Sequence, residues 1–460
     1  MRVEAVRPHD LVIMSALAIV LALGVTLVKP TVGLQIAIGF LILLVAFSSA
    51  RAALYLLIFS MLLSPEIAIG RLEGRGVGGR EISIRFDDLL LIIIGFTWLV
   101  KTIIYRELAL IKHTSINRPI VYYMVACIFA TLVGLLTGRV QPVSGFFFLL
   151  KYFEYFFIFF VVVNNISTRE QMVHLIIALL ATAFLISLYA IGQIPSGQRA
   201  SAPFEGEVGE PNTLGGYLVF IMAVSMGLLL HVRGVAVRWM LVALLGLLTL
   251  ALMATLSRTS YLAAGVLVLA IVATQWRRPA VVVMVLVGAL LVPVIAPANV
   301  KHRVHETFFG QKYGGEVSVG GVTVDLSTSE RLKSWTLVLR DWAQRPLLGY
   351  GITGYAWADA QYVKILGETG LVGLLAFGFM SVRLWRRARD AFLEEEDPVC
   401  KGIAHGFLLG LVAMLAHGLG ANTFIIIRIM EPFWLCAGLV VALPALHGKV
   451  PGTGAAQVRA

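Results

Sequence analysis

Charged side chains are scarce in this chain of 460 residues, because Asp, Glu, Lys and Arg together make up only 14% of it. A soluble globular domain carries about 25% charged residues, so the composition excludes an ordinary soluble protein. Hydrophobic residues instead make up 59% of the chain, and the mean hydropathy is +0.88. These values predict a protein that crosses a lipid bilayer many times.

Cysteine is equally scarce, and the three residues Cys127, Cys400 and Cys436 show no metal-ligand spacing. Neither a disulfide framework nor a zinc site is therefore expected. The chain also has no metalloprotease, phosphate-loop, nucleophile-elbow or dinucleotide-binding motif, and we predict no metal and no cofactor. The net charge of +11 comes with no basic tail and no aromatic–basic module, so we expect no nucleic-acid partner.

Apolar runs that are long enough to cross a bilayer follow one another along most of the chain. We expect an all-α polytopic membrane protein with about 12 to 14 spans, each needing about 20 residues. The run 52–64 is short enough to be interfacial or re-entrant instead. The expected spans are 11–28, 32–48, 52–64, 87–105, 119–137, 145–163, 171–192, 212–231, 236–256, 259–275, 279–297, 362–382, 402–421 and 424–445.

The positions of Lys and Arg predict the orientation of these spans. With the N-terminus inside, the pair Arg277–Arg278 and the cluster between Arg383 and Arg389 fall in inside loops, whereas short outside connections hold few basic residues. Both termini are therefore expected in the cytoplasm. The basic N-terminal stretch and the apolar run after it lack a small-residue cleavage site, and we interpret them as an uncleaved first span.

Three parts of the chain follow from this pattern. Residues 1–297 form an N-terminal transmembrane bundle of about eleven spans, with an outer loop at 65–86. Residues 298–361 form one large outside loop, and residues 362–460 form the C-terminal transmembrane helices and a cytoplasmic tail.

Two local structures are predicted within the large outside loop. The stretch EVSVGGVTVDL alternates around a Gly-Gly pair, which is typical of a β-hairpin. Farther on, Leu332, Trp335, Leu339 and Trp342 recur on one face, so we expect an amphipathic helix that ends near Pro346. Its tryptophan-bearing face suits the surface of a membrane.

Arginines on the outside of the membrane need an explanation. Arg199 and Arg258 lie in outside connections, and Arg428 lies inside or at the outer edge of the last span. A charge at such a depth costs several kcal/mol unless it is paired or hydrated, and it usually marks a substrate path. Snorkelling, or an ion pair of Arg428 with Glu431, is the structural alternative. Converging guanidinium groups would suit a diphosphate ligand.

The stretch ADAQYVKILGETG carries charges at the entry to an apolar run. Asp359 stands where a helix should begin, so helix capping is one interpretation of it. Lys364 and Glu368 are four residues apart and can form an ion pair on one helix face. His417 ends a span on the outer side, where it would serve either as a base or as a structural histidine at a helix end.

Taken in order, the motifs SRTSYLA, ERLKSWTLVLRDWAQRPLLGYGITGY and DAQYVKILGETGLVGLL resemble the O-antigen ligase and polymerase family of bacterial envelope proteins. The resemblance implies an inner-membrane glycosyltransferase of the C-type fold, with a periplasmic loop over a cavity. Such an enzyme takes a glycan from undecaprenyl diphosphate and passes it to an acceptor hydroxyl, without a nucleotide sugar.

The resemblance also implies roles for individual residues. Arg199 and Arg258 would hold the lipid diphosphate. The family's loop usually carries a His-Asn pair, which reads Asp359 and Ala360 here, so that Asp359 is left as the base. The predicted catalytic residues are Asp359 and Glu368, and the predicted diphosphate- or glycan-binding residues are Arg199, Arg258, Asn212, Arg331, Tyr362, His417 and Arg428.

The function predicted from these features is polymerisation of undecaprenyl-diphosphate-linked oligosaccharide repeat units at the periplasmic face. A ligase that passes the glycan to lipid A–core is the first alternative, and a transporter or flippase of lipid-linked glycans is the second. The expected partners are the lipid-linked oligosaccharide, an acceptor glycan or lipid A–core, membrane lipids and, for a polymerase, a chain-length regulator. Polar groups at the outer edge of the membrane favour an enzyme, because transporters place them near the midplane.

Overall fold

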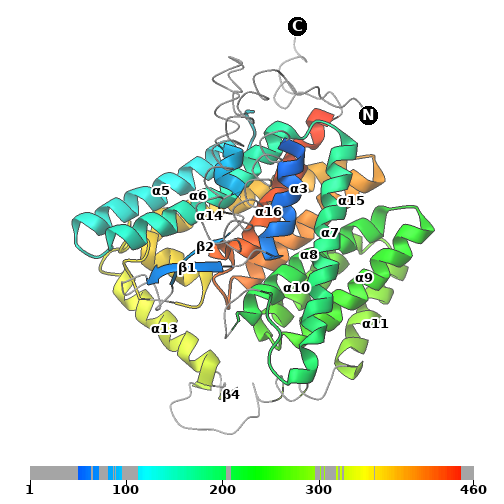
Figure 1. The fold of residues 1–460 in the computed structure, drawn as a ribbon. Helices are drawn as coiled ribbons and strands as arrows, with labels where there is room; N and C mark the ends of the chain where they lie inside the picture. The colour runs from blue at the N-terminus through cyan, green and yellow to red at the C-terminus, as the bar shows by residue number, and fades with distance from the viewer. Residues whose placement is uncertain are drawn as a thin grey trace, which may run out of the picture.

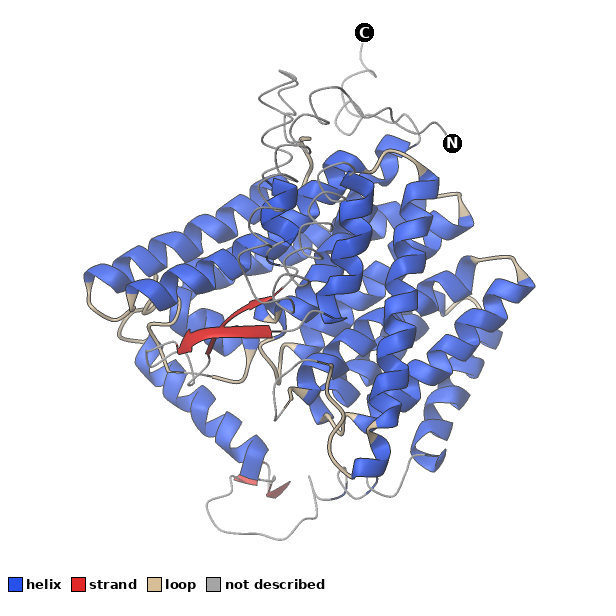
Figure 2. Cartoon of the chain, in the orientation of Figure 1, coloured by secondary structure: helices blue, strands red, loops and turns tan. Residues whose placement is uncertain are grey.

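Helices form nearly all of the part of the chain that the structure, a computed structural model, describes (Figures 1 and 2). The described residues are 50–63, 66–71, 81–85, 88, 90–95, 112–203, 209–295, 301, 305, 318–319, 322–323, 326–356 and 358–446. The predicted spans 11–28 and 32–48 and most of 87–105 lie outside these residues. Among the described helices, nine are long and apolar enough to cross a membrane. The predicted all-α polytopic fold is therefore confirmed.

The helices match the apolar runs closely from residue 117 onward. They differ from the prediction most at α14, which continues to Glu394 instead of ending at 382. They also differ at the connection between the last two helices, where the chain leaves the helical conformation and forms a turn. The helices are α3 (Ala50–Leu63), α5 (Asn117–Leu136), α6 (Pro142–Asn165), α7 (Arg169–Gly192), α8 (Pro211–His231), α9 (Val235–Ala254), α10 (Arg258–Gln275), α11 (Pro279–Ile295), α13 (Leu326–Trp342), α14 (Gln361–Glu394), α15 (Pro398–His417) and α16 (Ile427–Leu446), with short 3-10 turns η1 (Ile194–Ser196) and η2 (Thr423–Ile425).

Two small antiparallel hairpins accompany the helices. Strands β3 (Ser318–Val319) and β4 (Val322–Thr323) pair across the Gly-Gly dipeptide, which confirms the hairpin predicted in the large loop. Strands β1 (Glu66–Arg71) and β2 (Glu81–Arg85) form a second hairpin within the predicted outer loop 65–86. The alternating stretches EIAI and EISI were the signal for this second hairpin, which the sequence reasoning missed.

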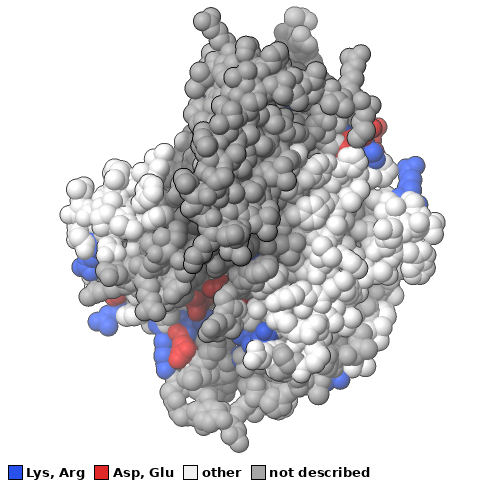
Figure 3. All heavy atoms as spheres, viewed as in Figure 1, with Lys and Arg blue, Asp and Glu red and all other residues white. Residues whose placement is uncertain are grey.

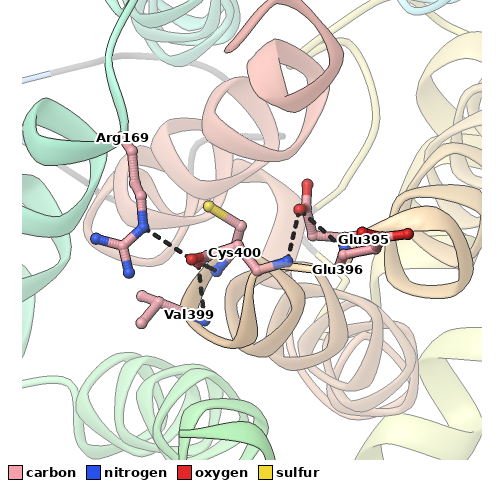
Figure 4. A network of polar contacts seen from close by, with 6 residues as sticks. Arg169, Glu395, Glu396, Val399 and Cys400 are labelled. Atoms are coloured by element: carbon pink, nitrogen blue, oxygen red, sulfur yellow. Dashed lines mark hydrogen bonds and ion pairs between the residues drawn. The ribbon is translucent and has the colours of Figure 1, made fainter. Parts of the chain in front are cut away.

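Successive spans run in opposite directions, so the connections gather at two ends of the bundle. At one end the start of α7 is joined to the start of α15, where the Nε of Arg169 lies 3.0 Å from the Oδ2 of Asp397 (Figure 4). Asp397 also caps α15 by accepting from the N–H groups of Val399 and Cys400. Burial alone would raise the pKa of Asp397, but the Cys400 N–H and the Arg169 guanidinium outweigh it and lower this pKa. This end also holds Arg277 and Arg278, which the charge distribution predicted to be cytoplasmic.

The opposite end holds the large loop and the predicted site. In Figure 1, helix α13 (yellow) lies outside the transmembrane bundle, at the lower left below α5 and α6. The coloured charged side chains of Figure 3 gather along the lower rim and at the upper right, and the described surface between them is mostly uncharged. An uncharged belt between two polar ends is what a bilayer-spanning bundle requires.

The centre of the bundle depends on a close approach of α8 and α15. Gly402, Gly406 and Gly410 recur every fourth residue on the face of α15 that meets α8. A Cβ atom placed on Gly406 would lie 2.7 Å from the Cα of Val224 and 2.9 Å from its carbonyl oxygen. Small residues at this spacing allow helix backbones to pack closely in lipid, where packing rather than the hydrophobic effect drives association.

Replacing Gly406 by valine should therefore destabilise the protein. The added side chain has no space against Val224, and overpacking of this kind costs about 1–3 kcal/mol. Thermal unfolding of the purified variant in detergent measures the effect. Gly246→Val is the matched control, because nothing lies within 4 Å of a Cβ at Gly246. Equal unfolding temperatures for the two variants would contradict the close approach.

Candidate active site

The turn between α9 and α10 brings two of the predicted arginines together. Arg258 is the first residue of α10, and the Nε of Arg199 donates to the carbonyl oxygen of Thr255 at 3.2 Å. The backbone N–H of Ala200 donates to the Ala254 carbonyl at 2.9 Å, which docks the Arg199 loop on the end of α9. Leu256, within this turn, has a φ of +50°, a strained conformation of the kind that clusters at functional sites. Arg199 and Arg258 thus flank one turn, as the diphosphate hypothesis requires.

A chain of buried polar groups connects this turn to α15. The hydroxyl of Ser257 donates to the Oδ1 of Asn212 at 2.7 Å and lies 2.8 Å from the Ser260 hydroxyl. The Ser260 Oγ lies 3.1 Å from the Nε2 of His417, whose Nδ1 is 2.7 Å from the Oγ1 of Thr423. His417 is fully buried. Both of its ring nitrogens therefore bind protein hydroxyls, and Asn212 belongs to the same network.

The remaining predicted arginines approach the turn from two other segments. The Nη1 of Arg331, on α13, lies 3.5 Å from the Oγ1 of Thr259. The Nη1 of Arg428 donates to the carbonyl oxygen of Pro203 at 3.1 Å, and this arginine is only 3% exposed. Arg428 therefore lies against the loop that carries Arg199. Glu431, its predicted alternative partner, has an Oε2 that lies 3.9 Å from the Nη2 of Arg85.

Asp359 is exposed at a bend of the chain, between the buried residues Ala358 and Ala360. The N-cap residue of α14 is Ala360, with no side-chain cap bond, so the interpretation of Asp359 as a helix cap is wrong. The side-chain amide of Asn422 donates to the Ala358 carbonyl at 2.8 Å. The backbone N–H of Gln361 donates to the carbonyl of Gly418 at 3.0 Å. The segment of Asp359 is thus bound to the residues that directly follow His417.

Two amide side chains beside Asp359 were missed by the sequence reasoning. Gln361 accepts a hydrogen bond from the Phe424 N–H through its Oε1, at 2.8 Å, but its buried Nε2 donates to no group of the described structure. The buried Oδ1 of Asn422 likewise accepts from no described group. One buried donor and one buried acceptor therefore have no described hydrogen-bond partner in the two segments that meet at Asp359. The only sequence feature that pointed to Asn422 was the polar stretch GANTF after His417.

Helix α14 is interrupted nine residues after it begins. Gly370 has φ +63° and ψ −161°, a conformation that is open to glycine alone. The N–H groups of Leu371 and Val372, past the break, donate to the carbonyls of Pro346 and Leu347 at 2.8 and 3.1 Å. The loop before α14 therefore inserts its backbone into the break.

Glu368 holds the other side of this insertion. Its Oε1 accepts from the Nζ of Lys364 at 2.7 Å and from the backbone N–H of Thr353 at 3.0 Å. Its carbonyl accepts from Gly351, and the carbonyl of Gly367 accepts from Tyr350. Glu368 is 2% and Lys364 3% exposed, so the predicted ion pair is confirmed and buried. The contacts of Glu368 are to groups that shape the loop rather than to Asp359.

Tyr362 directs its hydroxyl to the backbone carbonyl of Leu415 on α15. Its ring lies 6.3 Å from the ring of Phe377. The hydroxyl predicted to bind substrate is thus engaged with α15, and Tyr362 fastens the first turn of α14. Among the described residues, no three His, Cys, Asp or Glu side chains gather as metal ligands. The arrangement therefore offers arginines and an exposed carboxylate.

Part of this site lies in a segment that matches a known family model. Residues 242–378 match the family model described as O-antigen ligase, and these residues include Arg258, Arg331, Asp359, Tyr362 and Glu368. No curated protein matches the chain. The resemblance indicated by the sequence motifs is confirmed over this segment. Proteins of this family are glycosyltransferase-like enzymes of glycan assembly that act on lipid-linked glycans and acceptors, and this chain is a multi-pass membrane protein with such a domain.

The buried position of Glu368 leads to a prediction about stability. Glu368→Gln would leave the Lys364 ammonium buried without its counter-charge, a change that costs about 3–5 kcal/mol. We expect a clear loss of thermal stability in detergent, and partial recovery in the double variant Lys364→Met/Glu368→Gln, which restores neutrality and keeps an acceptor for the Thr353 N–H.

Glu394→Gln is the matched control, since Glu394 is an exposed acid near the end of the same helix. If Glu368→Gln unfolds at the wild-type temperature but has lost its activity, then Glu368 is a catalytic residue and not part of the frame.

Proposed function

We propose that this member of the O-antigen ligase family polymerises undecaprenyl-diphosphate-linked oligosaccharide units at the periplasmic face of the inner membrane. One observation carries the proposal: Arg199, Arg258 and Arg331, from three separate segments, gather at the α9–α10 turn, which the buried network of His417 connects to the segment of Asp359. Guanidinium groups bind phosphate oxygens bidentately, so these arginines suit the diphosphate of a lipid-linked donor.

The proposed reaction is one inverting displacement. The oxygen of an acceptor sugar hydroxyl attacks the anomeric carbon of the donor glycan, and the bond from that carbon to the diphosphate oxygen breaks. Asp359 takes the proton of the hydroxyl. The electron pair of the broken bond stays on the departing lipid diphosphate, whose growing charge the arginines stabilise. The product is the lengthened glycan and undecaprenyl diphosphate.

The geometry supports Asp359 over His417 as the base. Asp359 is exposed, whereas His417 is fully buried and holds hydroxyl groups of Ser260 and Thr423 with its two nitrogens. We assign to His417 the role of orienting the serine network below Arg258. Glu368, with Lys364, is assigned to the frame of the loop rather than to proton transfer.

The location of the polar groups argues against a transporter. The predicted site residues lie at the ends of α8, α10, α14, α15 and α16, on the side where the large loop lies. A transporter of lipid-linked glycans would instead need a polar site near the middle of the membrane. The opposite end carries Arg169, Arg277 and Arg278, so the rule of positive cytoplasmic loops supports a periplasmic site and cytoplasmic termini.

A ligase that transfers the glycan to lipid A–core is the second candidate, because the description of the matching family names that activity. The test is an assay with purified protein, a lipid-linked repeat unit and EDTA. A ladder of lengthened lipid-linked products supports a polymerase. Transfer only when lipid A–core is added supports a ligase, and a requirement for Mg²⁺ or Mn²⁺ would contradict the metal-independent mechanism.

Arg258→Lys should be nearly as damaging in this assay as Arg258→Ala. An ammonium group cannot reproduce the bidentate contacts of a guanidinium group with a diphosphate. Turnover and donor binding by the purified variants measure the effect. Arg233→Lys, an exposed position at the opposite end of α8, serves as the control. Wild-type turnover by Arg258→Ala at a normal protein level would remove Arg258 from the donor site.

Asp359→Asn should lower turnover by roughly 10²–10⁴, the usual range for a lost general base. Because Ala360 and not Asp359 occupies the N-cap of α14, the substitution should leave folding and donor binding intact. Turnover, donor binding and thermal stability of the same preparation separate these effects. A variant that turns over like wild type would show that the base lies elsewhere, with His417 as the next residue to test.

A further inference from the structure

A second pair of arginines surrounds one tyrosine away from the α9–α10 turn. The guanidinium carbon of Arg139 lies 5.7 Å from the centroid of the Tyr350 ring, and that of Arg345 lies 5.4 Å from it. The Nη1 of Arg345 also lies 3.4 Å from the Oγ1 of Thr137. Figure 3 shows blue side chains along the lower left rim, over the ends of α5, α6 and α13, with red side chains among them. Neither arginine belongs to the donor site described above.

Within the described part of the chain, no carboxylate forms an ion pair with Arg139 or Arg345. The N-terminus of α6, which begins at Pro142, adds the positive end of a helix dipole close to Arg139. The Oε1 of the N-cap residue Gln141 accepts from the Ser144 hydroxyl at 3.3 Å rather than from a backbone N–H of α6. Two guanidinium groups and a helix N-terminus beside one ring form a place for a multiply charged anion.

The two arginines are held by a rigid frame rather than by loose side-chain contacts. Val140, next to Arg139, is buried among glycines of both segments: a Cβ on Gly134 would lie 2.5 Å from its Cγ2, and one on Gly351 would lie 2.6 Å from it. The N–H of Ile352 donates to the Oγ1 of Thr131 on α5 at 3.3 Å. The turn that carries Arg139 is therefore locked against the loop that carries Arg345.

Helix α13 connects this second pair to the donor arginines. Arg331, near its beginning, contacts Thr259 beside Arg258, and Arg345 follows its end. In between, Val338 and Trp335 pack on Ala358 and Ala360, the two neighbours of Asp359. At a rise of about 1.5 Å per residue, the 17 residues of α13 span roughly 25 Å. The segment of Asp359 thus lies between two separate groups of arginines.

We propose that Arg139 and Arg345 bind the diphosphate of a second lipid-linked glycan, the acceptor of the reaction. The inference rests on the proposed function, since it assumes that Asp359 deprotonates an acceptor hydroxyl. With the donor diphosphate at Arg258, the reacting anomeric carbon is the one bonded to that diphosphate, so only the acceptor glycan extends along α13, from its diphosphate at Arg345 to the hydroxyl that Asp359 deprotonates. Two fixed diphosphate sites flanking one base are what a polymerase needs, because both of its substrates carry the same lipid anchor.

Binding is tested without any catalysis. The purified protein in detergent is titrated with undecaprenyl diphosphate, and the number of bound lipids is counted by native mass spectrometry. We expect two in the wild type, one in Arg139→Gln/Arg345→Gln and one in Arg258→Gln. Arg340→Gln, an exposed arginine on α13, is the control and should bind two. If the Arg139→Gln/Arg345→Gln variant still binds two, or if phosphatidylglycerol added in the same detergent displaces the second lipid equally well, the inference is wrong.

Kinetics then test the role as acceptor site. Transfer is measured to a lipid-linked acceptor and to the same oligosaccharide released from its lipid diphosphate. The Arg139→Gln/Arg345→Gln variant should raise KM for the lipid-linked acceptor by roughly tenfold or more, the loss expected for charge-assisted contacts to phosphate. Transfer to the released oligosaccharide should not change. Equal loss with both acceptors would overturn the assignment.

The two experiments separate failure of this inference from failure of the proposed function. If no glycosyl transfer occurs under any condition, the proposed function fails, but the binding stoichiometry still decides whether a second diphosphate site exists. If transfer occurs and the variant treats both acceptors as the wild type does, the proposed function stands and the inference fails.

Discussion

The buried carboxylate of Glu368 and the helix break beside it are the constraint on which the site depends. Inside a bilayer every backbone group needs a partner within the protein, so a helix can be interrupted only where other groups replace its hydrogen bonds. Here the inserted loop supplies the replacement partners, which are the carbonyls of Pro346 and Leu347 and the N–H groups of Tyr350, Gly351 and Thr353. Because Lys364 neutralises Glu368 within the same turn, the insertion is satisfied in both hydrogen bonds and charge. Together with the contacts of Ile352 with Thr131 and of Ala358 with Asn422, it fixes the large loop on the bundle.

One arginine of the donor site, Arg331, and the second pair of arginines depend on this insertion. The inserted loop carries Tyr350 and therefore places Arg345 beside Arg139, and it leads into the segment of Asp359. Helix α13, which precedes the loop, places Arg331 against Thr259. Within the described residues, the only non-glycine positions with positive φ are Leu256 and Thr353, one at the donor turn and one in the inserted loop. Backbone strain of about 1–3 kcal/mol per residue persists only where surrounding contacts hold it, and both positions are held in this way.

Much of the fold could be predicted because the length and hydropathy of a membrane span can be recognised in the sequence. The arginines at the span edges could be singled out from the sequence, because placing a charge at the border of the lipid costs free energy and usually marks a functional site. The ion pair of Lys364 with Glu368 followed from helical spacing, and its burial did not, because burial depends on the loop that covers it. The sequence identified Asp359 as a candidate residue but could not decide whether it caps α14, since helix boundaries vary by one or two residues.

The sequence by itself determined that this chain spans a membrane many times, where most of its helices begin and end, and which end of the bundle carries the unusual charges. These properties depend on neighbours in the chain, through hydropathy runs and local charge. Only the tertiary structure decided that Asn422 binds the carbonyl of Ala358 and Gln361 the N–H of Phe424, and that Arg139 and Arg345 meet at Tyr350. Such pairs come from segments that are far apart in sequence, and their meeting depends on the glycines that let Val140 lock two turns together. Local patterns cannot encode that contact, because it exists only after the helices have packed.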